Sequence, residues 1–185
     1  MKQELGKTLS EMSLEELWHL FPITLEQHNS EWAEWYKDEE NRLRGILGDR
    51  VSRTDHIGST AVKGLIAKPI VDILLQRAPD TELSEIMNLL VADGWLVMAE
   101  NSDFGEVDLN KGYTPQGFAQ RVFHLHIRKE GNWDELRFRD YLVDNPEAAS
   151  QYAELKKQLA VAFRHNRDAY TAAKTAFVKA SLAQD

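Results

Sequence analysis

The stretch from His56 to Leu75 constrains the fold of this chain most strongly, because it joins two apolar runs through a turn of small residues. Ile57 is followed by Gly58-Ser59-Thr60, then by a segment compatible with a short helix, and the second apolar run contains one acid, Asp72. Glycine lets backbone N–H groups approach an anion closely, and a helix start adds partial positive charge. An acid among apolar residues needs a cationic partner. The stretch therefore predicts a site for phosphate and a metal ion.

Composition limits the classes of protein to consider. With 185 residues and 43% hydrophobic content, the chain suits a single domain with a substantial core. It has no apolar run approaching the roughly 18 residues that span a bilayer, and its start lacks the apolar segment of a signal peptide. A net charge of −8 argues against general nucleic-acid binding, and the absence of cysteine excludes disulfide and thiol chemistry. We expect a cytoplasmic protein without membrane or nucleic-acid partners.

Hydrophobic periodicity divides residues 1–185 into three parts of one α+β domain. Residues 1–50 are expected to form helices, 51–128 a sheet core that carries the site, and 132–185 a helical part. The predicted strands are Val51–Ile57, Pro69–Leu75, Trp95–Ala99 and Val122–Arg128, and the turn-rich segment Asn101–Gly117 is expected to be a loop or a ragged hairpin near the site.

The segment Val122–Arg128 alternates strongly between polar and apolar residues, which places His124, His126 and Arg128 on one face of a strand. Two histidines on one face are able to bind a metal or to contact phosphate, and one of them could act as a general base near neutral pH. The structural alternative is that one imidazole packs internally while the other lies at a strand edge. The sequence alone leaves these readings open.

Several motifs together are specific to this chain, and they are EELWHLFPITL at 15–25, HIGSTAV at 56–62, AKPIVDILL at 67–75, KGYTPQGF at 111–118, VFHLHIR at 122–128, RFRDYL at 137–142, NPEAASQYAELK at 145–156 and NRDAYTAAKTAFV at 166–178. In these motifs the chain resembles the GrpB-like family, and the resemblance extends over nearly its full length. Members of this family are assigned to the nucleotidyltransferase superfamily, with a polymerase-beta-like fold. The resemblance implies a small mixed sheet flanked by helices and a helical C-terminal part. Some relatives are fused to dephospho-CoA kinase, which suggests nucleotide or coenzyme chemistry.

The superfamily motif combines a Gly-Gly or Gly-Ser turn with two acids spaced one residue apart on a strand. Gly58-Ser59 matches the turn and Asp72 the first acid, but Leu74 stands where the second acid is expected. Paired carboxylates normally hold the two Mg²⁺ ions of nucleotidyl transfer. We expect His124 and His126 to compensate for the missing acid, so that Asp72, His124 and His126 form a metal site. Imidazole suits Mn²⁺ or Zn²⁺ better than Mg²⁺. Asp72 and His126 are the candidate catalytic residues.

Basic side chains supply the candidate phosphate ligands. Lys68 precedes the second apolar run, and Arg139 lies on the helix that follows the histidine strand. Two Tyr-x-x-x-Lys pairs each project from one helix face, which would offer an aromatic surface to a base and an ammonium group to a phosphate. A packed tyrosine with a lysine extending to solvent is the alternative. The complete set predicted to contact phosphate or nucleotide is Gly58, Ser59, Thr60, Lys68, Arg139, Lys156 and Lys174.

Three functions are compatible with these residues. The first is a metal-dependent, nucleotidyltransferase-like enzyme acting on a nucleotide or a phosphorylated small molecule. The second is a binding module that retains the phosphate site but, lacking an acid at Leu74, does not turn its ligand over. The third, ranked last, is metal buffering through the histidine pair.

Overall fold

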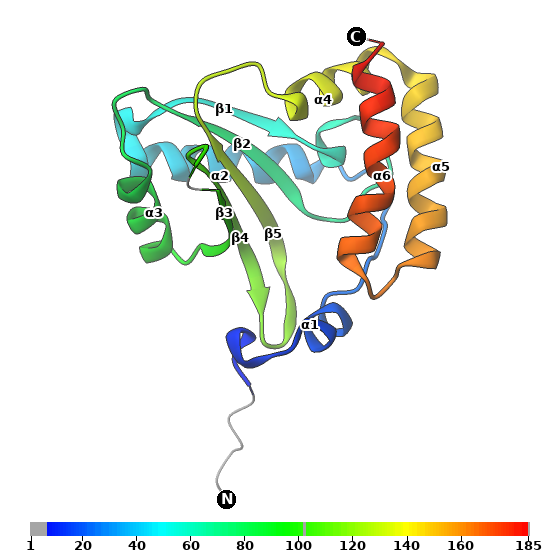
Figure 1. Ribbon diagram of the computed structural model, residues 1–185, viewed down its shortest axis with the longest axis horizontal. Coiled ribbons are helices and arrows are strands. Elements are labelled where there is room, and N and C mark those ends of the chain that lie inside the picture. Colours follow the sequence, from blue (N-terminus) through cyan, green and yellow to red (C-terminus); the bar gives the residue numbers. More distant parts are fainter. Residues whose placement is uncertain (1–6, 102, 185) are drawn as a thin grey trace, which may run out of the picture.

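The computed structural model describes residues 7–101 and 103–184 and shows an α+β fold built on a five-stranded mixed sheet (Figure 1). The strands lie in the order β1-β2-β5-β4-β3, and β2 and β5 pair in parallel, whereas the other neighbours pair antiparallel. This arrangement confirms the predicted small mixed sheet. The strands are β1 (Val51–Ile57), β2 (Val71–Arg77), β3 (Leu96–Asn101), β4 (Glu106–Thr114) and β5 (Gly117–Arg128).

Helices flank this sheet: in Figure 1, α2 passes behind the strands, α3 lies at the left, and α4 to α6 lie at the upper right and right. The short helix α1 lies beside the tip of the β4–β5 hairpin, and α5 and α6 run side by side at the right. The first helix begins with the capping box that the sequence contains, Ser13 with Glu16. The helices are α1 (Leu14–Leu20), α2 (Glu31–Leu47), α3 (Leu83–Ala92), α4 (Asp134–Asp144), α5 (Pro146–Ala162) and α6 (Arg167–Leu182), with single 3₁₀ turns at Leu9–Glu11, Gly48–Arg50 and Ser59–Ala61.

The two faces of the sheet differ in character. Val71, Ile73 and Leu75 of β2 are buried in the main core, where they meet the fully buried side chains of Trp32 and Leu43 from α2. Burial of each such side chain away from water stabilises the folded state by about 1.5–3 kcal/mol. The alternate residues of β2, of its neighbour β5 and of β4 on the far side of β5 point to the other face, where polar groups gather. Burial of the apolar residues in the core therefore fixes which residues of each strand face the other side, and these include the polar groups.

One prediction from the sequence is corrected by the fold, and one open alternative is decided. The turn Gly58-Ser59-Thr60 is not followed by a regular helix, because only the 3₁₀ turn Ser59–Ala61 separates it from the approach to β2. A helix dipole therefore does not contribute to anion binding there. Of the two forms expected for the segment Asn101–Gly117, the ragged hairpin is the one observed, because the whole of β4 lies in it and pairs with β3 and β5.

Other boundaries move by a few residues, as strand β5 begins at Gly117 rather than Val122. Residues 1–6 of the predicted N-terminal part lie outside the described residues. No helix in the described part of the chain is both long and apolar enough to cross a membrane.

Candidate functional site

A cavity of about 1070 Å³ lies on the polar face of the sheet and is bounded by the turn after β1, by the C-terminal helices and by the N-terminal segment. All ten residues predicted to form the site line this cavity, namely Gly58, Ser59, Thr60, Lys68, Asp72, His124, His126, Arg139, Lys156 and Lys174. The structure thus brings together the turn after β1, the segment before β2, and residues from β2, β5, α4, α5 and α6.

Asp72 and the two histidines are brought together by the parallel pairing of β2 with β5, in which Asp72 is the register partner of His124. The Oδ1 atom of Asp72 lies 3.1 Å from Nδ1 of His124 and 3.8 Å from Nε2 of His126. Nε2 of His124 lies 2.8 Å from the hydroxyl of Tyr113. In a neutral imidazole, Nδ1–H donates to Asp72 and Nε2 accepts from Tyr113. The acid in the apolar run therefore has the polar partners that its position required.

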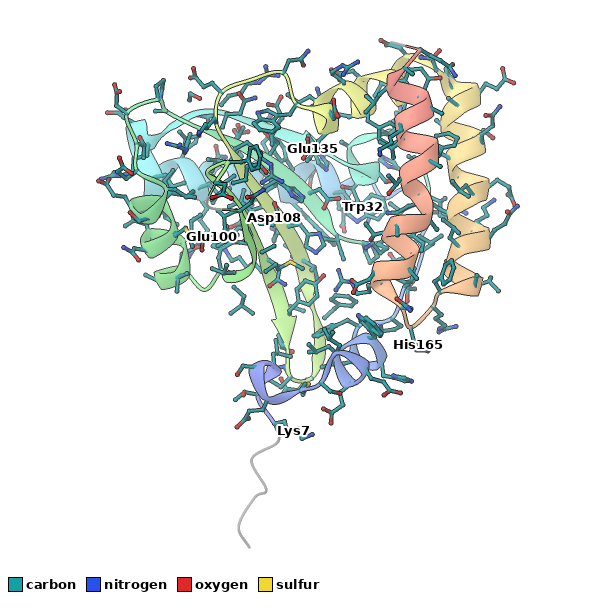
Figure 2. The ribbon with its side chains drawn as sticks, viewed as in Figure 1. Lys7, Trp32, Glu100, Asp108, Glu135 and His165 are labelled. Atoms are coloured by element: carbon teal, nitrogen blue, oxygen red, sulfur yellow. The ribbon has the colours of Figure 1, made fainter. Side chains whose placement is uncertain are left out.

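A second carboxylate, Asp108 on β4, belongs to the same group and was not predicted from the sequence. Its Oδ1 atom lies 2.9 Å from Nδ1 of His126, its register partner, and 2.8 Å from Arg128. Figure 2 shows Asp108 near the middle of the sheet, with Glu135 of α4 above it. The alternating pattern Val107-Asp108-Leu109 was the available signal, because it is typical of a half-buried strand. His126 thus bridges two carboxylates, Asp72 and Asp108.

The charges of this group follow from its hydrogen bonds. Burial alone would raise the pKa of Asp72, but the hydrogen bonds and charges of the two histidines outweigh it and hold this pKa well below its ordinary value. Burial would likewise lower the pKa of His126, but Asp108 and Asp72 raise it to about 9. Burial dominates at His124 and lowers its pKa. At neutral pH the group therefore combines two carboxylates, one imidazolium and one neutral imidazole.

The predicted metal ligands are adjacent, yet they meet through hydrogen bonds. Ligand atoms around a tetrahedral ion with bonds of about 2.1 Å lie about 3.4 Å apart, which is between the two separations measured from Asp72. Among residues 7–101 and 103–184, however, no three His, Asp or Glu side chains are disposed as a metal centre. A metal would require Asp72 and His124 to exchange their hydrogen bond for coordination. Metal binding by Asp72, His124 and His126 therefore stays a prediction.

The turn after β1 lies directly against Asp72. Gly58 has a φ of +68°, and a Cβ atom there would clash with Oδ2 of Asp72. Thr60 is buried and hydrogen-bonds Nε2 of His56 at 2.9 Å. The Ser59 hydroxyl accepts a hydrogen bond of 2.9 Å from Nζ of Lys156, which also contacts the carbonyl of Ile66. The small residues are needed because the acid and a lysine approach this turn so closely.

Lysines from three segments converge on the same cavity. Lys156 is only 2% exposed, and burial together with the charges of Lys174 and Lys68 lowers its pKa to about 7. Burial, reinforced by Arg167 and Lys174, lowers the pKa of Lys68 to about 7 as well. Burial also lowers the pKa of Lys174, with Asp72 acting in the opposite direction. These shifts mean that the folded protein holds several cations together at an energetic cost.

Arg167, at the start of α6, is a further cation of the cavity that the sequence did not single out. It donates a hydrogen bond of 2.8 Å to the hydroxyl of Tyr113, which in turn lies against His124. The guanidinium is also 5.3 Å from the centre of the Tyr113 ring. Its position between Asn166 and Asp168, in a segment without periodicity of its own, offered no signal. Arg167 and Tyr113 thus connect α6 to Asp72 through His124.

The Tyr-x-x-x-Lys pairs adopt the packed arrangement. Nζ of Lys156 lies 4.8 Å from the ring centre of Tyr152, and Nζ of Lys174 lies 4.4 Å from that of Tyr170. Both rings are buried, so the prediction that they offer an open aromatic surface to a base is not supported. Their faces support the lysine ammonium groups instead.

Arg139 is already engaged by protein groups. Its guanidinium pairs with Asp140 at 2.7 Å and with Asp55 at 3.7 Å, and it donates to the carbonyl of His56 at 3.0 Å. It therefore has less capacity for a phosphate than the lysines have. Its role as a phosphate ligand stays a prediction.

Strand β2 carries a single acid, Asp72, on the face that bears the site, because Leu74 occupies the next position on that face. Leu74 is fully buried against Ile57 and Leu136, in a small apolar cluster between β2 and α4. A carboxylate at this position would be surrounded by apolar atoms. Helix α4 thus packs against a leucine at the position where the superfamily motif has its second acid.

Comparison with known proteins gives a consistent family assignment. A family model described as GrpB protein matches residues 22–184. UPF0157 protein YqkA of Bacillus subtilis is 32% identical over 169 residues, which cover 88% of this chain and 48% of YqkA. The chain thus spans about half the length of that relative. A dephospho-CoA kinase of Mycolicibacterium paratuberculosis is 27% identical over 83% of this chain and 43% of the kinase.

A solved structure agrees with the sequence matches. The crystal structure of conserved protein GrpB from Enterococcus faecalis aligns with a TM-score of 0.74 and 32% identity, covering 87% of this chain and 96% of that one. Sequence and fold therefore lead to the same assignment: the chain belongs to the GrpB protein family.

Proposed function

We propose that this protein binds a nucleotide or another phosphorylated small molecule and acts on it as a nucleotidyltransferase-like enzyme. One observation carries the proposal. Lys68, Lys156, Arg167 and Lys174 line one cavity, and none of them forms an ion pair with a carboxylate among the residues that the structure describes. Buried cations without counterions are costly, and a phosphorylated ligand would supply the missing negative charge.

The surroundings of these cations support a phosphate rather than a carboxylate ligand. Three ammonium groups act as flexible point charges, and Arg167 adds a planar fork of donors. The Ser59 hydroxyl is held within the same group by Lys156. Several donors that converge from different segments suit a group with three or more anionic oxygens. We expect the three lysines, whose pKa values are lowered in the free protein, to recover their ordinary, charged state when the ligand is bound.

Asp72 and His126 are the proposed catalytic residues. Asp72 is ionised and is held by His124, so it is able to accept a hydrogen bond from an attacking hydroxyl group and to orient it. His126 is held between Asp72 and Asp108, and as an imidazolium it is able to stabilise developing negative charge. Both roles use only groups that line the cavity. A metal ion at Asp72, His124 and His126 is a separate prediction.

The alternative is a binding module that does not turn its ligand over. It is favoured by Leu74, which leaves β2 with a single acid where nucleotidyl transfer uses two. Asp108 is the other carboxylate of the group, but it already pairs with His126 and Arg128.

A thermal-shift panel tests ligand binding. The panel contains ribonucleoside triphosphates, pyrophosphate and coenzyme A precursors, each with and without Mg²⁺ and Mn²⁺. A ligand at a concentration of 100 times its Kd is expected to raise the Tm by roughly 5–10 °C. The proposed site is wrong if a ligand stabilises the wild type and if Asp72→Asn, His126→Ala and Lys174→Met all respond as the wild type does.

Turnover of the stabilising ligand separates the enzyme from the binding module. For an enzyme, we expect Asp72→Asn to retain the ligand-induced rise in Tm and to lose product formation, measured by chromatography of the reaction mixture. His19→Ala is the matched control, because His19 lies on α1 and stacks on His165. Binding without turnover in the wild type, with every acceptor tested, would support the binding module.

A further inference from the structure

The cavity is much larger than a phosphate group, and its two ends differ in chemistry. One end holds Ser59, Asp72 and the lysines described above. The other end is apolar and is built from the N-terminal segment and from strand β3, with Leu9, Leu14, Leu17, Trp18, Leu96 and Met98 among its lining residues. A cavity of about 1070 Å³ therefore has room for an organic group beside the phosphate.

Exposed apolar side chains concentrate at this end of the cavity. Of the nine large apolar side chains that are exposed in the described part of the chain, four line this cavity: Leu14, Leu96, Val97 and Met98. Leu14 is 63% exposed and Leu96 is 44% exposed. Apolar side chains that gather in the open around a cavity are typical of a binding surface, whereas scattered ones need no explanation.

The N-terminal wall of the cavity, formed by Leu9 to Leu20, is held in place by specific contacts. Leu9, Leu17 and Leu20 pack against a buried cluster that contains Phe21 and Tyr113. The rings of Phe21 and Tyr113 are 4.7 Å apart. Figure 1 shows α1 beside the tip of the β4–β5 hairpin, and Figure 2 shows Lys7 close to this N-terminal segment. The wall is thus an ordered part of the fold, although α1 contains no buried residue of its own.

Tyr113 joins the apolar end to the cationic end. Its ring belongs to the apolar cluster with Phe21, while its hydroxyl contacts His124 and Arg167. A ligand whose phosphate reaches Arg167 would therefore place the atoms next to that phosphate against the Tyr113 and Phe21 end. The family match begins at Pro22, so the wall formed by Leu9 to Leu20 lies outside the matched residues.

We infer that the N-terminal segment and β3 form an apolar subsite, and that the ligand is a phosphate ester with a sizeable apolar group; this rests on the proposed phosphate site. The phosphate binds at the lysines, and the apolar group lies between Leu14 and Leu96. The N-terminal segment thereby selects among phosphorylated molecules by the size of their apolar part.

Isothermal titration of the full chain with methyl, butyl and hexyl phosphate tests the subsite. Each fully buried methylene tightens binding roughly fourfold, so hexyl phosphate is expected to bind at least about tenfold more tightly than methyl phosphate even with partial burial. The double variant Leu14→Ser/Leu96→Ser is expected to reduce this ratio by at least about threefold, because both side chains are partly exposed and their replacement removes only apolar contact area. Val161→Ser, at an exposed position of α5 outside the cavity, keeps the ratio of the wild type.

The outcomes separate the two proposals. Equal affinities for methyl and hexyl phosphate refute the apolar subsite and leave the phosphate site intact. A preference for hexyl phosphate that persists in the double variant also refutes it. If no alkyl phosphate binds, and if pyrophosphate and nucleotides do not bind either, the phosphate site fails and the subsite fails with it.

Discussion

The Nζ atom of Lys156 lies 2.9 Å from the Oγ atom of Ser59, which ties helix α5 to the turn that follows β1. The ammonium group is buried and has a serine hydroxyl and a backbone carbonyl as its partners, without a carboxylate. A buried charge in this state is stabilised by an anion and destabilises the fold without one. This contact therefore links the stability of the fold to occupancy of the cavity.

Replacing Lys156 by Met is expected to separate stability from binding. The variant loses an uncompensated buried charge, so the free energy of unfolding without ligand is expected to rise by about 1 kcal/mol or more. Its response to phosphorylated ligands is expected to disappear. Urea unfolding and thermal shift measure the two effects. Lys157→Met is the control, because Lys157 is exposed and pairs with Glu154; an equal effect of both variants would contradict the assignment.

The lowered pKa of Lys156 predicts a pH dependence of stability. Between pH 7 and pH 10 the unfolded chain carries a proton on this lysine that the folded protein largely lacks, so stability rises with pH in this window. We expect the free energy of unfolding to increase between pH 7 and pH 9 by about 1–2 kcal/mol more in the wild type than in Lys156→Met. Urea titrations at the two pH values measure the difference.

The pH dependence of stability must be compared between the wild type and Lys156→Met, because His126 changes the stability of both proteins in the opposite direction as pH rises. Its pKa is raised to about 9, so the stability that it contributes is present below pH 6.5 and is lost as pH rises through 9. The same loss occurs in the wild type and in Lys156→Met, and it cancels in their difference. Parallel pH profiles for the two proteins would show that Lys156 keeps its ordinary pKa.

Asp108→Asn is expected to destabilise the fold. Asp108 pairs with both Arg128 and His126, and Arg128 is buried. Removing the carboxylate leaves these cations without their principal partner, at a cost of about 3 kcal/mol. Asp38→Asn breaks an exposed pair with Arg121 and is expected to cost less than about 1 kcal/mol. Chemical denaturation compares the two, and similar losses would show that Asp108 is a surface charge.

Gly58→Ala is expected to disturb Asp72 specifically. The added methyl group would clash with the Asp72 carboxylate, and the positive φ adds strain, for a loss of about 2–4 kcal/mol in stability. Gly64→Ala also meets a positive φ but has open space around its Cβ, so only the strain of about 1 kcal/mol is expected. Thermal unfolding measures both. Equal losses would mean that the close approach of Asp72 to the turn carries no cost.

The metal prediction is tested by elemental analysis of protein prepared without a histidine tag and incubated with Zn²⁺, Mn²⁺ or Mg²⁺. Two imidazoles and one carboxylate favour a transition metal over Mg²⁺, with about one ion bound per chain. Asp72→Asn and His124→Ala are expected to lose the ion, whereas His165→Ala, which alters an exposed histidine beside α1, retains it. Wild-type protein that remains free of metal under these conditions would rule out the metal site.

Local patterns were sufficient to predict much of this protein. A strand period of two placed His124 and His126 on one face, and the lone acid in an apolar run identified Asp72. Hydrophobic periodicity predicted the helical parts at 1–50 and 132–185, where α1, α2 and α4 to α6 lie. The resemblance to the GrpB-like family supplied the mixed sheet. These features depend on neighbours in the chain, and such neighbours can be read from the sequence.

The remaining features depend on which segments meet in space. Asp108 became a partner of His126 only because β4 pairs with β5, and the sequence left this segment open between a loop and a ragged hairpin. Arg167 reaches the site through Tyr113, which belongs to another element. The burial that lowers the pKa of Lys156 arises when α5 packs on the turn at Ser59. The sequence determined which groups are available, whereas tertiary packing decided their neighbours, because desolvation and charge pairing depend on distance in space.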